Sequence, residues 1–397
     1  MSKNKTLVKL SWLGLSLFLL QCQKSQDVRT TDYPAIQAKF GSIIDPANLI
    51  DYAGQPVPSY ITKDAARTTP LKNPQALLGR VLFYDKSLSV DNTVSCASCH
   101  KQEFAFSDTA LVSDGVSDGV TLRHAMRLVN NRFAMEQHFF WNKRAASLEE
   151  QTTMPIQDHA EMGFSGQNGR PNLNVLLNKL RSIDYYQELF QFVYGDASVT
   201  EQRLQECLAH FVRSMQSFDS RYDAGRALVP NDGAPFPNYT PQENLGKNLW
   251  LAPPVFDAGG SRISGGLGCN GCHAAPEFDI DPRSGNNGVI GIINANGIEV
   301  NNTKAPSLRD LVNPSGALNG PLMHSGNFTT LKQVVGHYGK INLAPGNTNL
   351  DPRLRPNGNG QQLNLTADEV NAVVAFIQTL SGNKLYQDHK WGDPFNK

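Results

Sequence analysis

Two short patterns of cysteine and histidine are the residues of this chain best suited to chemistry. "SCASCH" spans residues 95–100 and "GCNGCH" spans residues 268–273, and together they hold four of the six cysteines. Thiols and imidazoles bind metals, and paired thiols also exchange electrons or form covalent bonds. Each copy therefore predicts a redox or metal centre, built in order along the chain from Cys96, Cys99, His100, Cys269, Cys272 and His273.

Three kinds of centre share the CxxC core of these patterns. A structural zinc site usually closes its four ligands within a short stretch, but these two pairs lie far apart in the sequence. A thioredoxin-like redox site needs a βαβ context, and no such pattern surrounds either copy. A c-type haem uses the whole CxxCH motif, because two thiols bond to the porphyrin and the adjacent histidine ligates the iron. The sequence therefore predicts two covalently bound c-type haems.

The elements around the two copies follow the same order. Helical patterns at 74–85 and 241–251 precede the first and the second copy, and a long loop follows each of them. Further helices are expected at 201–218, after Thr200 as N-cap, and near the end of the chain at 329–338 and 366–382. Strand patterns are scarce, apart from a short hairpin at 288–300. The predicted fold is mainly α, with two cytochrome c-like haem domains and long loops.

The domain boundaries follow from composition. The predicted segments are a signal peptide at 1–22, an irregular lead-in at 23–70, and haem domains at 71–235 and 236–397, joined near the Pro-rich and Asn-rich stretch 229–241. The last helix of the second haem domain is expected to begin at Thr366 and to stop at Gly382. Cys207, on the 201–218 helix, is expected to be a buried apolar residue.

The N-terminus predicts export. Three lysines precede the uncharged run "LSWLGLSLFLL" at 10–20, which has the length of a secretory signal. Cys22 follows at once, so a lipoprotein anchor, ordinary secretion into the periplasm and a short uncleaved anchor stay open. The chain carries 36 basic and 36 acidic residues, which argues against a nucleic-acid partner.

The residues between the two motifs resemble the bacterial dihaem cytochrome c peroxidases. "FFWNKRAASLEEQTTMPIQDHAEMG" (139–163) is similar to that family's signature, and "KAPSLRDLV" (304–312) and "PLMHSGNFTTLKQVVGHY" (321–338) are similar to its second half. The enzymes that mature methylamine dehydrogenase share the same scaffold. The resemblance runs from about residue 74 to about residue 382 and implies a two-haem oxidoreductase.

The resemblance assigns roles in peroxide chemistry to three residues. Glu161 would move the proton between the two peroxide oxygens, Gln151 would orient peroxide, and Trp141 would lie between the haems. The intervals from 141 to 151 and from 151 to 161 are both ten positions, as the family pattern requires. Glu149 and Glu150 are expected on the helix surface or behind the site.

The resemblance also makes the two haems unequal. It implies a catalytic N-terminal haem with an open position and a C-terminal relay haem whose sixth ligand is Met323, with His324 as the rival. The tyrosine of the methylamine-pathway enzymes is absent from "GPLMHSG". Residues 107–122 contain no histidine, so the catalytic haem is expected to be five-coordinate without prior reduction. His124 replaces an asparagine that helps to bind calcium in the family, which leaves a calcium ion in question.

The predicted function is reduction of hydrogen peroxide to water. The electrons would come from a small redox protein, either a cytochrome c or a copper protein, and would enter through the C-terminal haem. Two alternatives stay open: a dihaem oxidase that modifies a protein or organic substrate, and a dihaem electron carrier without chemistry of its own. A homodimer stays open as well.

Overall fold

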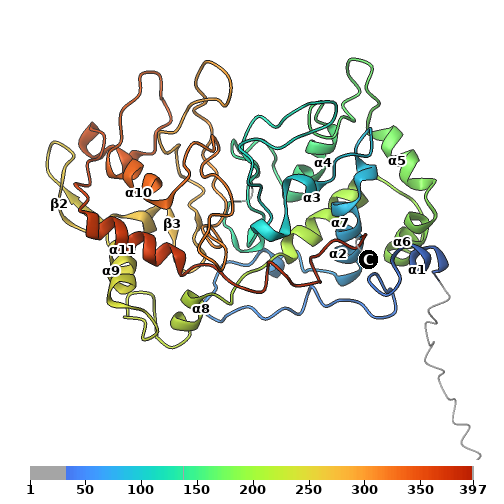
Figure 1. Cartoon of the computed structure of the whole chain (residues 1–397), viewed down its shortest axis with the longest axis horizontal. Coiled ribbons are helices and arrows are strands. Elements are labelled where there is room, and N and C mark those ends of the chain that lie inside the picture. The colour runs from blue at the N-terminus through green and yellow to red at the C-terminus, as the bar shows by residue number, and fades with distance from the viewer. Residues whose placement is uncertain (1–32, 137, 396–397) are drawn as a thin grey trace, which may run out of the picture.

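The computed structural model describes residues 33–136 and 138–395 and is rich in helix, with little sheet (Figure 1). This confirms the mainly α prediction. The α-helices are α1 (Pro34–Phe40), α2 (Asn73–Tyr84), α3 (Cys96–Cys99), α4 (Leu148–Gln157), α5 (Leu173–Arg181), α6 (Asp184–Tyr194), α7 (Glu201–Ser214), α8 (Arg221–Arg226), α9 (Pro241–Leu251), α10 (Leu331–Gly339) and α11 (Ala367–Gln378). The strands are β1 (Pro254–Phe256) with β2 (Arg262–Gly265), and β3 (His273–Ala274) with β4 (Asp279–Ile280), both pairs antiparallel.

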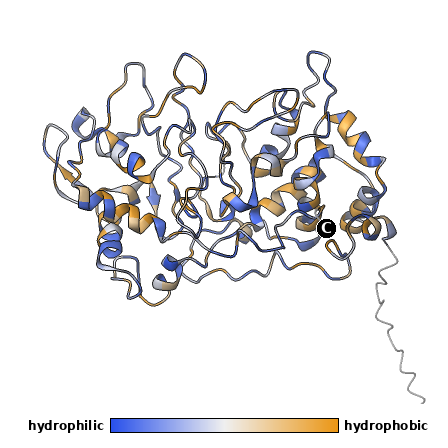
Figure 2. Cartoon of the chain, viewed as in Figure 1, coloured by the Kyte–Doolittle hydropathy of each residue, from blue (hydrophilic) through white to orange (hydrophobic). Residues whose placement is uncertain are grey.

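Two hydrophobic cores divide the described chain. The first core is built largely from residues of α1 to α7, and the second from residues 222–380. The helices of both halves carry most of the strongly apolar segments (Figure 2). Long loops lie between the two sets of helices, and they include the segments that follow each CxxCH motif (Figure 1).

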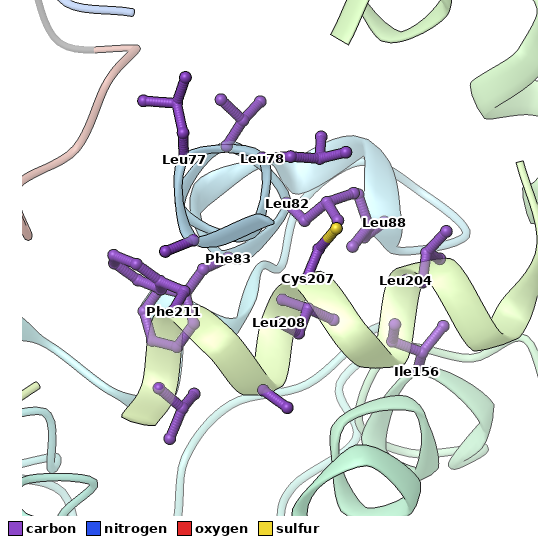
Figure 3. Packing of buried hydrophobic residues seen from close by; sticks show 14 of the residues in the cluster. Leu77, Leu78, Leu82, Phe83, Leu88, Ile156, Leu204, Cys207, Leu208 and Phe211 are labelled. Atoms are coloured by element: carbon purple, nitrogen blue, oxygen red, sulfur yellow. The ribbon is translucent and has the colours of Figure 1, made fainter. Parts of the chain in front are cut away.

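The same helix-packing device recurs in both halves. In the first half α2 crosses α7, and leucine and phenylalanine side chains of α2 pack on Leu204, Cys207, Leu208 and Phe211 (Figure 3). A Cβ atom at Gly79 of α2 would lie 2.0 Å from the carbonyl oxygen of Cys207, so only glycine permits this crossing. In the second half Gly246 of α9 lies in the same relation to Ala372 of α11, at 1.9 Å. Each CxxCH motif thus follows a helix in which a glycine allows close packing against a helix that comes later in the chain.

Helix starts match the predictions more closely than helix ends. Thr200, Thr240 and Thr366 each accept a hydrogen bond from a backbone N–H in the first turn, which caps α7, α9 and α11 as Thr caps do elsewhere. The prediction for 201–218 was too long, because α7 ends at Ser214. Gly382 is not the stop of α11, which ends four residues earlier at Gln378.

Other elements were missed or only partly predicted. The lead-in 23–70 was expected to be irregular, but it contains α1, whose Ile36 and Phe40 are buried in the first core. The hairpin expected at 288–300 forms a single antiparallel bridge between Gly291 and Ile298. Cys207 is fully buried, as predicted.

The last residues of the chain return to the first half. After α11, residues 383–395 run along α2, and Leu385 and Trp391 belong to the first core. Arg80 donates to the carbonyl oxygen of Gly392 at 2.7 Å, and Tyr84 donates to that of Trp391 at 2.6 Å. We call residues 383–395 the C-terminal strap.

The predicted signal segment and Cys22 lie outside the described residues. Within the described part of the chain, no helix combines the length and the apolar character needed to cross a membrane.

Candidate functional site

The first CxxCH motif forms a short, tightly capped helix. Ser95 and Ser98 form a reciprocal capping box at the start of α3, and His100 is the C-cap that follows its last residue, Cys99. The Nδ1–H group of His100 donates to the carbonyl oxygen of Phe106 at 3.0 Å, which orients the ring and leaves Nε2 for a metal. Burial lowers the pKa of His100, so the imidazole is neutral and able to ligate iron.

Glu161 lies in the turn that follows α4. The N–H group of Val116 donates to its carbonyl oxygen at 3.0 Å, and its own N–H donates to Asp158 Oδ1 at 3.1 Å. Cβ atoms at Gly115 and Gly119 would lie 1.9 and 2.4 Å from the carbonyl oxygen of Ala160. The two glycines therefore let the loop after the first motif close directly on the backbone that carries Glu161.

The Glu161 carboxyl interacts electrostatically with both thiols of the first motif. Its negative charge contributes to the raised pKa values of Cys96, about 12, and Cys99, about 11, although burial is the main cause for both thiols. The pKa of Glu161 itself is raised to about 7, first by burial and then by the charge of Asp158, while Arg144 and Arg123 act in the opposite direction. A carboxyl group with a pKa near 7 can both accept and return a proton at neutral pH.

Gln151 and Trp141 come from the same segment of the sequence, but Gln151 lies on α4 and Trp141 contacts the second half of the chain. Gln151 lies half-buried on α4, one turn after the Ser147 N-cap. Within the described chain, the structure does not bring it together with the residues of the first motif through a hydrogen bond of its side chain. Trp141 joins the two halves: its carbonyl oxygen accepts from the N–H groups of Thr303 and Lys304, both at 3.0 Å. Its indole ring lies 6.1 Å from the ring of His324, centroid to centroid.

The second motif opens into a cavity of about 580 Å³. Cys269, Cys272 and His273 line it, together with Met323, His324, Trp141 and many apolar side chains. This volume lies within the ~300–1,000 Å³ range of sites that hold small molecules and cofactors. Burial lowers the pKa of His273 to about 4, so its imidazole is neutral. Two thiols, a neutral imidazole and a largely apolar wall fit a covalently attached haem.

Three side chains near this cavity could supply a sixth ligand. Met323 has a left-handed backbone, with φ of 68°, and its Sδ accepts from Asn287 Nδ2 at 3.2 Å. His324 is buried, and its Nε2 has no hydrogen-bond partner in the described part of the chain. The structure adds Tyr338, whose hydroxyl oxygen accepts from the same Asn287 amide at 3.1 Å. Met323 and Tyr338 therefore share one hydrogen-bond donor.

The sequence analysis missed Tyr338, although a signal was present. Leu331, Val334 and Val335 of α10 line the cavity, and Tyr338 follows at the i, i+3, i+4, i+7 spacing of a single helix face. Burial raises the pKa of Tyr338 well above its usual value, and the hydroxyl belongs to the wall of the same cavity as Cys269 and Cys272.

His124 lies between the halves. Its Nδ1 donates to the carbonyl oxygen of Ala110 at 3.0 Å, and its Nε2 lies 3.4 Å from Ser107 Oγ, which itself donates to the carbonyl oxygen of Ala125. Its backbone N–H donates to the carbonyl oxygen of His324 at 3.0 Å, and burial lowers its pKa to about 4. With both ring nitrogens occupied, His124 supports the contact between the halves in this structure.

Comparison with known proteins supports the resemblance. Residues 73–227 match the family model described as di-haem cytochrome c peroxidase. The chain is 28% identical to methylamine utilization protein MauG of Methylophilus methylotrophus over 80% of this chain and 86% of that protein. It is 27% identical to cytochrome c551 peroxidase of Nitrosomonas europaea over 80% of this chain and 82% of that protein.

Solved structures agree. A MauG-like protein associated with microbial copper homeostasis is 25% identical, with a TM-score of 0.64 over 86% of this chain and 99% of that one. The diheme peroxidase BthA of Burkholderia thailandensis, 21% identical with a TM-score of 0.60 over 87% of this chain and 94% of that one, shares the fold. The recognition made from the sequence is thereby confirmed, and the chain is a relative of the di-haem cytochrome c peroxidase and MauG proteins.

Proposed function

We propose that this protein reduces hydrogen peroxide to water, using two electrons and two protons per peroxide. Two c-type haems, held by the CxxCH motifs in two cytochrome c-like domains, would supply the redox chemistry when bound. The observation that carries the proposal is Glu161: a carboxyl group of near-neutral pKa, beside the thiols of the first motif and fixed by the loop that contains Gly115 and Gly119.

Glu161 would act on protons at the reacting centre. Its carboxylate takes a proton from one peroxide oxygen and returns it to the other, which then leaves as water. Gln151 is proposed to orient peroxide for this transfer, as the resemblance implies. The nearby positive charges of Arg123 and Arg144 keep part of the Glu161 population ionised at neutral pH, which a proton acceptor requires.

A difference between the two histidines supports unequal roles for the two centres. The Nδ1 of His100 donates to a carbonyl oxygen, whereas the Nδ1 of His273 is buried and has no hydrogen-bond partner among the described residues. A hydrogen bond at Nδ1 makes the imidazole a stronger donor to iron, which favours the oxidised metal. The second centre is therefore expected to have the higher reduction potential, as an electron relay needs.

The proposed role of the second centre as an electron relay requires a partner protein that donates electrons to it. Electrons would come from a small cytochrome c or copper protein and enter through the second centre, with Met323 as its proposed sixth ligand. Trp141 lies in the wall of the second cavity and belongs to the segment that leads to Glu161, which supports its proposed place between the two centres. Export to the periplasm, with or without a lipid at Cys22, remains part of the proposal.

The test is replacement of Glu161 by Gln. Glu161→Gln keeps the shape of the side chain but removes the exchangeable proton, so peroxide turnover with a reduced cytochrome is expected to be lost while both haems stay attached. Glu103→Gln, at an exposed carboxylate three residues after His100, is the matched control and is expected to keep full turnover. Undiminished turnover in Glu161→Gln would remove its assigned role.

Tyr338 favours a second candidate function, the oxidation of a protein or organic substrate. A phenolate is a hard anionic ligand that stabilises more oxidised iron, whereas a thioether stabilises reduced iron. Ligation by Tyr338 in place of Met323 would suit an enzyme that withdraws electrons from a substrate. The similarity to MauG proteins is as high as that to the peroxidases, so the ligand at this position discriminates between the two functions.

A further inference from the structure

Arg127 is a buried cation in the wall of the second cavity. Only 7% of its surface is exposed, and Nη2 donates to the carbonyl oxygen of Ser307 at 3.2 Å. Its Nε is buried without a hydrogen-bond partner in the described chain, and no carboxylate there forms an ion pair with the guanidinium. A buried charge with unused donors is unfavourable unless an anion binds to it.

The nearest acidic group does not fill this role. Asp310 is fully buried and acts on Arg127 through its charge, but it forms no ion pair with Arg127: its Oδ1 accepts from the Gly382 N–H at 2.9 Å and the Tyr386 hydroxyl at 3.1 Å, and its Oδ2 has no hydrogen-bond partner in the described chain. Those contacts hold Asp310 toward the chain segment after α11. Arg127 thus keeps a donor group for something that enters the cavity.

The other cations of the cavity wall already have partners. Lys304 donates to the carbonyl oxygen of Glu136 at 3.1 Å and lies over the ring of Phe139. Arg353 is paired with Asp351 through two hydrogen bonds of 2.9 and 2.7 Å. Of the three cationic side chains that line the cavity, Arg353 forms an ion pair, Lys304 donates to a carbonyl oxygen, and Arg127 is the one with a buried N–H donor that has no partner in the described chain.

We infer that Arg127 is a positioning residue that binds a propionate carboxylate of the haem in the second cavity. This rests on the proposed attachment of a haem at Cys269 and Cys272. A haem carries two carboxylates into a largely apolar pocket, and a guanidinium is the side chain best shaped to bind a carboxylate there. None of the roles that the resemblance implies falls on Arg127, in the segment "RHAMRLVN".

The pairing has a measurable consequence for the second haem. A fixed cation close to the haem favours the reduced iron, which carries one positive charge less, and it also neutralises the propionate. Loss of the cation should therefore lower the reduction potential. A tenfold change in the reduction equilibrium corresponds to 59 mV for a one-electron couple.

The experiment is a redox titration of the purified protein with both haems attached. Arg127→Gln is expected to lower the midpoint potential of the second haem by roughly 59 mV or more, a tenfold loss in the equilibrium, and to leave the first haem unchanged. Arg127→Lys keeps the charge and is expected to show less than half of that shift. The control is Arg132→Gln: Arg132 is equally buried but forms an ion pair with Asp64 outside the cavity wall.

A second readout covers the case in which Arg127→Gln does not fold. The propionate bending band in the resonance Raman spectrum responds to hydrogen bonding of the carboxylate, and it is expected to move in Arg127→Lys. An unchanged band, an unchanged potential in Arg127→Gln, or equal falls in the Gln and Lys variants would overturn the inference. A wild-type protein with fewer than two haems would overturn the proposed function as well, and the haem count distinguishes that outcome.

Discussion

The indole Nε1 of Trp141 donates a hydrogen bond to the backbone carbonyl oxygen of His124 at 2.9 Å. This bond fixes the ring in the wall of the second cavity, close to His324. Trp141→Phe keeps an aromatic ring but loses the donor, and we expect electron transfer between the haems to slow roughly tenfold or more because the ring is no longer held in place. Stopped-flow spectra after peroxide addition to the half-reduced protein measure this rate.

A matched variant separates the role of Trp141 from general damage to packing. Trp391→Phe changes a buried tryptophan that also donates through its indole, to Ser214 Oγ at 3.1 Å, but that belongs to the first core. It is expected to keep the wild-type transfer rate. Equal slowing in both variants would contradict a specific role for Trp141.

The pH dependence of peroxide turnover should follow Glu161. Its carboxyl must be ionised to accept a proton, and its pKa is about 7, so turnover is expected to rise with pH through a midpoint near neutrality. Arg144 lowers this pKa and Asp158 raises it. Arg144→Gln should therefore move the midpoint to higher pH, and Asp158→Asn should move it to lower pH. Shifts of the same sign in both variants would disprove the assignment of the midpoint to Glu161.

Gly115→Ala tests the geometry of the site without removing any of its polar groups. A Cβ atom there would lie 1.9 Å from the carbonyl oxygen of Ala160 and 3.0 Å from the Cα of Glu161, so the loop and the turn must separate. Gly115→Ala is expected to reduce turnover by roughly 100-fold with both haems attached, because a displacement of about 1 Å is that costly at a reacting centre. Gly336→Ala, where a new Cβ meets nothing within 4 Å, is the control and should retain activity.

The sixth ligand of the second haem can be assigned by two substitutions. Met323→Leu is expected to convert that haem from a low-spin to a high-spin spectrum and to lower its potential, while Tyr338→Phe should preserve its ligation. Electron paramagnetic resonance and visible spectra of the oxidised protein report both properties. The reverse pattern would make Tyr338 the ligand and would favour oxidation of an organic or protein substrate over peroxidase activity.

The C-terminal strap should contribute to the stability of the first half. Trp391 is 3% exposed in the first core, although it lies 177 positions after its hydrogen-bond partner Ser214, the last residue of α7. Trp391→Ala should reduce the free energy of unfolding by roughly 3–5 kcal/mol, as for other large-to-small changes in a core. Chemical denaturation followed by tyrosine and tryptophan fluorescence measures the change, and a loss below about 1 kcal/mol would show that the strap is peripheral.

Local signals explain what could be predicted from the sequence. The CxxCH motifs carry their chemistry within six residues, and the threonine caps of α7, α9 and α11 act within one helical turn. Glu161 was found through its register with Trp141 and Gln151, and the structure adds the two glycines and the charges that act on it.

The features that were missed depend on contacts between distant segments. Tyr338 matters because α10 faces the cavity of the second motif, and Arg127 because its half of the chain forms part of that cavity's wall. Gly382 looked like a helix stop, yet its N–H group donates to Asp310 at 2.9 Å, seventy-two positions away, while α11 ends earlier. Periodicity and composition within a short window do not contain such pairings.

The C-terminal strap also has a consequence for biogenesis. The first CxxCH motif is synthesised long before Leu385 and Trp391. Until those two residues are made, part of the first core is uncovered. Cys96 and Cys99 are partly exposed even in the folded chain, and an open core would leave both thiols more accessible for attachment of the proposed haem. Because Leu385 and Trp391 follow both motifs in the sequence, we expect the proposed haem to be attached at the first motif before the first core closes.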